Sequence, residues 1–223
     1  MEQSKTIEGY PLSPQQRRIW QLQADSHALV TQCGVLIQGP LQLDRLRECL
    51  GQLIRSHEIL HTAFQRLPAM ALSLQVIVEP NTPPVRVLDC PGDDASFSLL
   101  CAGERARSFA LESGDVLHVA VARAGADRHL LVLTLPALCA DSVSLFNLLQ
   151  QLSESYAASS PQPAREVVQY ADFSAWQNDV CKSTAAGYAP VRLPLEHLNV
   201  PSPADFAPEC LTLTQDAGSV SKF

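Results

Sequence analysis

The sequence has little positive charge, and what it has is scattered. Its 16 Lys and Arg residues are outnumbered by 23 Asp and Glu, which gives a net charge of −7. Nucleic acids and anionic membranes attract proteins through patches of Lys and Arg. The pair Arg17-Arg18 stands alone, so the charge pattern argues against nucleic acid or a membrane as the main partner.

Long apolar runs are also missing. No uncharged stretch reaches the roughly 18 residues that a membrane-spanning helix needs, and the first residues, MEQSK, lack the apolar core of a signal peptide. We therefore expect a cytoplasmic protein. Hydrophobic residues make up 46% of the 223 residues, which is enough for the packed core of one large domain or two small ones.

Several catalytic and metal-binding patterns are absent. The seven cysteines have neither zinc-ligand nor Cys-x-x-Cys spacing, so we expect buried free thiols in a reducing compartment. No Gly-x-Ser-x-Gly nucleophile motif occurs. These absences predict that the chain itself holds no metal and no cofactor.

Hydrophobic periodicity predicts helices mixed with hairpin-connected strands. The expected helices cover residues 13–22, 43–56, 94–106, 142–156 and 170–181, and the expected strands cover 31–38, 60–64, 72–78, 85–88, 117–123 and 129–135. Ser13 and Gln16 form a capping box around Pro14. The pattern is that of an α/β protein with a mixed sheet and packed helices.

One strand-to-helix loop, residues 136–142 (PALCADS), is the first candidate for a functional site. Such loops present side chains at the mouth of a rigid sheet. This loop contains one acid, Asp141, and no base. Asp141 and Ser142 are also good helix caps, and Cys139 has no identifiable base beside it.

Four segments, in order, resemble the condensation domains of non-ribosomal peptide synthetases. Residues 13–22 (SPQQRRIWQL) are similar to Ser-x-Ala-Gln-x-Arg-Leu-Trp-x-Leu, and residues 56–64 (SHEILHTAF) to Arg-His-Glu-x-Leu-Arg-Thr-x-Phe. Residues 136–142 fall where the family has His-His-x-x-x-Asp-Gly, and residues 170–176 (YADFSAW) resemble Tyr-x-Asp-Phe-Ala-x-Trp. The resemblance implies that Trp20 and Trp176, in the first and last of these segments, lie in the core.

The resemblance implies a chloramphenicol acetyltransferase-like fold of two lobes, of which this chain covers the first. It implies a condensation-like lobe at residues 1–181. The Pro/Ser/Ala-rich residues 182–223, with a strand-like run at 210–214, would then form the crossover toward a second lobe or a following domain.

This sequence departs from the family motif at the positions that carry the family's chemistry. Pro136 and Ala137 stand at the two histidines and Ser142 at the glycine, so only Asp141 remains. The family pairs this Asp with the arginine of the second motif, whose position is His61 here, so the resemblance implies a His61–Asp141 structural pair. The heterocyclising subfamily uses Asp-x-x-x-x-Asp-x-x-Ser, in which Asp141 and Ser144 match but Pro136 does not.

We therefore interpret the chain as a catalytically degenerate condensation-like domain that serves as a structural or docking platform. Expected partners are an adenylation or carrier domain of the same synthetase, a tailoring enzyme, the missing second lobe, or a second copy of the chain. A carrier would bring its own phosphopantetheine arm. Two alternatives stay open: acyl transfer from a carrier-bound thioester to an amine at an atypical site, and a standalone acyltransferase of another pathway.

Overall fold

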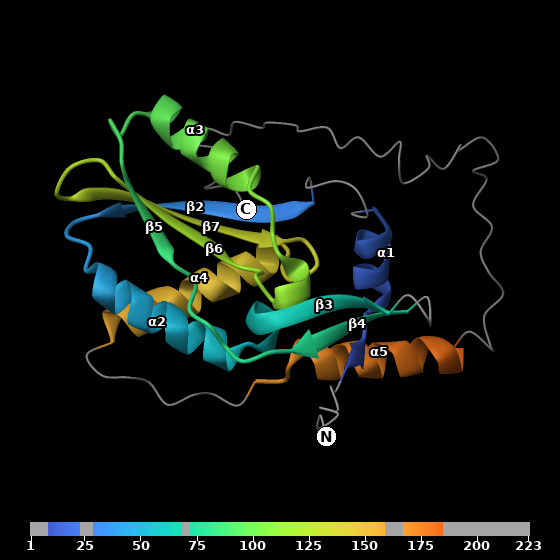
Figure 1. The fold of residues 1–223 in the computed structure, drawn as a ribbon. Coiled ribbons are helices and arrows are strands. Elements are labelled where there is room, and N and C mark those ends of the chain that lie inside the picture. Colours follow the sequence, from blue (N-terminus) through green and yellow to red (C-terminus); the bar gives the residue numbers. More distant parts are fainter. Residues whose placement is uncertain (1–8, 23–28, 68–71, 159–166, 185–223) are drawn as a thin grey trace, which may run out of the picture.

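A four-stranded mixed sheet forms the centre of the fold (Figure 1). The computed structural model describes residues 9–22, 29–67, 72–158 and 167–184. The strand order is β2-β7-β6-β5, with antiparallel pairs β2/β7 and β6/β7 and a parallel pair β5/β6. The strands are β2 Val30–Gln38, β5 Val85–Asp89, β6 His118–Arg123 and β7 Arg128–Pro136. The predicted mixed sheet is confirmed.

A second, antiparallel sheet of three strands lies beside it, in the order β1-β4-β3. Its strands are β1 Tyr10–Pro11, β3 Thr62–Leu67 and β4 Leu72–Ile77. The strand predicted at residues 60–64 begins later, because Glu58–His61 form the 3-10 turn η1. The sequence pattern had not separated the two sheets, since alternation identifies the face of a strand but not its partner.

In the part of the chain that the structure describes, five α-helices surround the sheets, each within three residues of its predicted bounds. They are α1 Pro14–Leu22, α2 Leu43–Ser56, α3 Asp94–Arg105, α4 Ser142–Ala157 and α5 Tyr170–Thr184. The predicted capping box of α1 is present. The Gln16 amide donates to Ser13 Oγ at 3.1 Å, and the Ser13 amide donates to Gln16 Oε1 at 2.9 Å.

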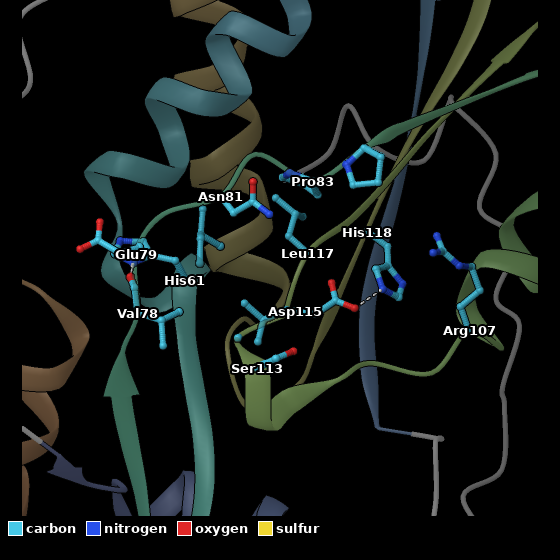
Figure 2. Close-up of a pocket in the computed structure, with 14 residues that line it drawn as sticks. His61, Val78, Glu79, Asn81, Pro83, Arg107, Ser113, Asp115, Leu117 and His118 are labelled. Carbon is cyan, nitrogen blue, oxygen red and sulfur yellow. Dashed lines mark hydrogen bonds and ion pairs between the residues drawn. The ribbon is translucent and has the colours of Figure 1, made fainter. Parts of the chain in front are cut away.

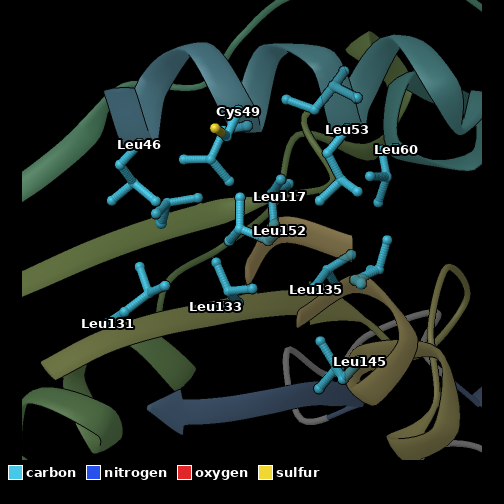
Figure 3. Packing of buried hydrophobic residues seen from close by; sticks show 14 of the residues in the cluster. Leu46, Cys49, Leu53, Leu60, Leu117, Leu131, Leu133, Leu135, Leu145 and Leu152 are labelled. Carbon is cyan, nitrogen blue, oxygen red and sulfur yellow. The ribbon is translucent and has the colours of Figure 1, made fainter. Parts of the chain in front are cut away.

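The main core lies between the mixed sheet and the pair of helices α2 and α4 (Figure 3). It consists mainly of leucines and valines from these elements: Leu46, Leu50, Leu53, Ile54, Val119, Val121, Leu131, Leu133, Leu135, Leu145, Leu148 and Leu152. Each buried aliphatic side chain contributes about 1.5–3 kcal/mol. Helix α3 covers the opposite face, packing Phe97 and Leu100 near Ala120 and Val132. The central strands β6 and β7 are therefore buried on both faces.

Four local expectations need correction or lie outside the described residues. Trp176 was expected in the core, but it lies on α5 and is 60% exposed. Cys181 is also exposed, while the other five cysteines of the described ranges are buried or half-buried, and all six are free thiols. Helix α5 continues to Thr184, past the boundary expected at residue 181. The strand-like run 210–214 lies outside the described residues.

In the part of the chain that the structure describes, no helix is both long enough and apolar enough to cross a membrane.

Candidate functional site

The loop 136–142 joins β7 to α4 and is fixed at its start by backbone hydrogen bonds. Pro136, the last residue of β7, is buried and Ala137 is half-buried. The Ala137 amide donates to the Leu29 carbonyl at 2.9 Å, and the Cys139 amide donates to the Pro136 carbonyl at 2.9 Å. The methyl group at Ala137, where the family has its second histidine, has no proton-accepting atom.

Side chains from other elements hold the rest of this loop. Gln16 of α1 donates through Nε2 to the Leu138 carbonyl at 3.2 Å. Thr31 of β2 donates through Oγ1 to the Ala140 carbonyl at 2.8 Å. Both contacts join residues more than 100 positions apart, so the loop conformation depends on the tertiary fold rather than on its own sequence.

Asp141 caps helix α4. Its Oδ1 accepts hydrogen bonds from the Ser144 amide at 2.8 Å and from the Ser144 hydroxyl at 2.7 Å. These two bonds, with the amide bond first, lower the pKa of Asp141 below its ordinary value. Ser142, at the glycine position of the motif, is the first residue of α4 and is exposed. Asp141 thus stays ionised and has the geometry of a cap.

The His61–Asp141 pair implied by the resemblance is not formed in this structure. The Nδ1 atom of His61 donates to the Val78 carbonyl, while Asp141 is bound to Ser144. The reason is local: the turn η1 turns the buried His61 ring toward the end of β4. The two residues therefore have separate structural roles.

No catalytic base lies at the loop among the described residues. Each histidine in the described ranges is hydrogen-bonded elsewhere: His57 to Gln151, His61 to Val78, His118 to Asp115 and His129 to Ala126. Burial raises the pKa of the Cys139 thiol, which disfavours the reactive thiolate. Within the same residues, no group of His, Cys, Asp and Glu side chains is arranged to hold a metal ion.

Sequence reasoning missed a second polar cluster, which lines a separate cavity of about 450 Å³ (Figure 2). His118, at the start of β6, lies 3.3 Å from Asp115, measured from Nε2 to Oδ2. Its ring stacks on Phe109 with centroids 4.0 Å apart. The only signal in the sequence is an Asp three residues before a His at the start of a buried strand, which is too common to identify a site.

Comparison with known proteins places the chain among condensation domains. The sequence profile of the condensation domain matches residues 6–187. Tyrocidine synthase 3 of Brevibacillus parabrevis is 30% identical over 181 residues, which are 80% of this chain and 3% of that protein. Surfactin synthase subunit 2 of Bacillus subtilis (strain 168) is 31% identical over 174 residues, which are 76% of this chain and 5% of the relative.

Solved structures show the same fold. The complex of the X-domain and OxyB from teicoplanin biosynthesis contains a similar chain, with a TM-score of 0.69 and 21% identity over 83% of this chain and 41% of that one. This chain therefore spans less than half of the similar solved chain, and a few per cent of the curated relatives. The profile match covers most of the sequence, and the chain belongs to the condensation domain family of non-ribosomal peptide synthetases.

Proposed function

We propose that this chain is a catalytically degenerate condensation domain that serves as a docking platform within a peptide synthetase. The observation that carries the proposal is Ala137, which stands where the family motif has its second histidine. General base catalysis needs a proton acceptor within hydrogen-bonding reach of the attacking group. A methyl group supplies none.

The surroundings of Ala137 support a structural reading of the loop. The amides of Ala137 and Cys139 and the carbonyls of Leu138 and Ala140 are already bonded to protein groups. The carboxylate of Asp141 is bonded to Ser144. These groups are therefore less free to orient a substrate than to hold the loop in place.

The surface of α5 offers a place for a partner. Phe173, Trp176 and Val180, which we call the α5 apolar face, are 42%, 60% and 37% exposed. Their spacing of three and four residues puts them on one side of the helix, and the rings of Phe173 and Trp176 lie 5.6 Å apart. Contiguous exposed apolar surface of this kind is typical of interaction sites.

The partner we propose is a neighbouring adenylation or carrier domain of the same synthetase. The second lobe, a tailoring enzyme and a second copy of the chain are the other candidates. The X-domain with the same fold provides a precedent, since it was solved in a complex with OxyB. A carrier domain would bring its own phosphopantetheine arm. We also propose that residues 1–181 form the lobe and that residues 182–223 lead out of it.

An assay of amide formation separates this proposal from acyl transfer at an atypical site. The full chain, supplied with a second lobe, is incubated with an acyl-loaded carrier and an amine acceptor. We expect a rate no higher than uncatalysed aminolysis. Proximity alone can accelerate such a reaction considerably, so a rate well above background that falls in Asp141→Ala would contradict the proposal.

The variant Ala137→His, alone and with Pro136→His, shows what has been lost. Restoring the base is expected to raise turnover only if the rest of the site is intact. Ser142→Gly is the matched control, because it restores a motif residue that carries no proton acceptor. Equal turnover in Ala137→His and Ser142→Gly would mean that more than the base is missing.

A further inference from the structure

The cavity beside His118 is separate from the loop 136–142. In the described residues it is bounded by η1, by the connection from β4 to β5 and by residues 113–118 (Figure 2). No residue of the loop 136–142 lines it. Leu60, Val78, Pro83 and Leu117 provide apolar wall, and His61, Glu79, Asp115 and His118 provide polar wall.

A glycine allows the two sides of this cavity to approach each other. Gly114 follows the 3-10 turn η3 (Leu111–Ser113) with a φ of +80°, in the left-handed region. A Cβ at this position would lie 2.7 Å from Cγ2 of Val78. Only glycine therefore lets the chain bring Asp115 in close beside the end of β4.

Two buried imidazoles on the wall each have one nitrogen bonded within the protein. His61 and His118 are 7% and 6% exposed. The Nδ1–H of His61 donates to the Val78 carbonyl, and in a neutral ring the Nε2 atom would then be an acceptor. The Nε2–H of His118 points to Asp115, and its Nδ1 is buried without a partner. Burial, the largest cause, lowers the pKa of His118 and favours the neutral ring.

The donors on the same wall are largely in use. The Ser113 hydroxyl donates to the Ala110 carbonyl at 2.9 Å. Arg107 donates to the buried carboxylate of Glu104 at 2.8 Å, and because Arg86 binds the same carboxylate, the charge of Arg107 is only partly balanced. Glu79 and Asp115 add two carboxylates, and no lysine is among the described residues that line the cavity. Acceptors and negative charge are therefore in excess.

We propose that this cavity binds a small protonated primary amine that carries a short aliphatic chain. An ammonium group has three donors and no acceptor, which complements a wall rich in acceptors. Asp115 is its charge partner, beside His118, and the stacked ring of Phe109 holds the imidazole in position. Leu60, Val78 and Leu117 contact the aliphatic chain, as apolar walls do in most ligand sites.

Three probes of equal length and different charge test the proposal on the full 223-residue chain. The 15N-labelled protein is titrated with n-butylamine, 1-butanol and butyrate at neutral pH, and the amide signals of residues 113–118 are followed. We expect n-butylamine to bind at least about tenfold more tightly than either other probe, a ratio that corresponds to one charge-assisted contact.

Two charge-removing variants and a matched control locate the binding. Asp115→Asn should weaken n-butylamine about tenfold and leave 1-butanol nearly unchanged. Glu112→Gln removes the same charge from an exposed residue of η3 that does not line the cavity, and should leave binding unchanged. If Asp115→Asn lowers the melting temperature, Glu79→Gln serves as a second variant in which n-butylamine binding is measured, because Glu79 is an exposed residue of the cavity wall.

Any of three results would overturn the inference. The first is no saturable binding of n-butylamine. The second is tighter binding of butyrate, which would assign recognition to Arg107 instead. The third is equal binding of n-butylamine by the unmodified chain and by the variants of Asp115 and Glu79. None of these residues is in the loop 136–142, so failure here is independent of the docking proposal.

Discussion

At the scale of single residues, Asp141 acts as the N-cap of α4. Its carboxylate accepts hydrogen bonds from the Ser144 amide and hydroxyl in the first turn of that helix. An N-cap satisfies backbone donors that have no partner inside the helix. This requirement is independent of catalysis, so Asp141 is needed for the start of α4 whether or not the loop 136–142 takes part in a reaction.

Asp141→Ala should therefore lower the free energy of unfolding by about 1 kcal/mol, the usual cost of losing an N-cap. Urea denaturation at neutral pH measures it. Asp141→Asn is the matched control, because the amide oxygen still caps, and it should stay within about 0.5 kcal/mol of the unmodified chain. An equal loss in both variants would point to the charge rather than the cap.

The same carboxylate gives a pH dependence with a defined sign. Its pKa in the folded chain is lower than the ordinary value of 3.8, because the Ser144 bonds favour the ionised form. The contribution is complete above that ordinary value and is lost as the pH falls through the lower folded pKa. The free energy of unfolding of the unmodified chain, relative to that of Asp141→Asn, should be constant around neutral pH. It should fall in acid, where the Asp141 carboxylate becomes protonated. A constant difference down to about pH 2 would contradict this assignment.

At the scale of elements, a buried carboxylate joins α3 to β5. Glu104, near the end of α3, is 2% exposed and accepts from Arg86 of β5 and from Arg107. Breaking a buried ion pair leaves groups without partners, which costs more than losing an exposed pair. The Arg47–Asp44 pair on α2 is the exposed counterpart, with Asp44 almost fully accessible.

Glu104→Gln should lower the free energy of unfolding by about 2 kcal/mol, because both guanidinium groups lose their charged acceptor. Asp44→Asn removes one charge from an exposed pair and should change it by less than about 0.5 kcal/mol. Thermal and urea denaturation of the two variants make the comparison. Equal effects would show that the Glu104 cluster is not a structural link between α3 and the sheet.

The sequence predicted elements better than their arrangement. Every α-helix in the described ranges was predicted because apolar residues recur at helical spacing and because caps such as Ser13 and Asp141 mark the starts. The separation into two sheets was not predicted, since β1 has only two residues and pairs with β4 more than 60 positions away. Partners of single side chains, such as Val78 for His61, depend on the turn η1, which has no strong signal.

For the candidate site too, the sequence predicted the elements better than the contacts between them. The loop 136–142 was located from the strand and helix that flank it, and from its family resemblance. The cavity at Asp115 and His118 was missed, because it is formed by η1, the β4–β5 connection and residues 113–118. Trp176 was misplaced because its expected core position came from a family motif, and an apolar helix face has the same spacing whether it meets the core or solvent.

At the scale of the whole molecule, the mixed sheet is covered on both faces, whereas apolar side chains of α5 are exposed. The mixed sheet is covered by α2 and α4 on one face and by α3 on the other. Helix α5 lies at the margin beside the three-stranded sheet (Figure 1), with the α5 apolar face exposed. The chain spans 40–50% of the length of the similar solved chains. We propose that a neighbouring domain of the synthetase covers the α5 apolar face.

The most direct test is the molar mass of the purified chain in solution, measured by light scattering, alone and mixed with an adenylation or carrier domain of the same synthetase. We predict a one-to-one complex that Trp176→Ser weakens. Leu99→Ser, at an apolar residue of α3 that is 76% exposed against 60% for Trp176, should leave the complex intact. Two separate species at their individual masses, or a stable dimer of the chain that excludes its neighbour, would contradict the docking function.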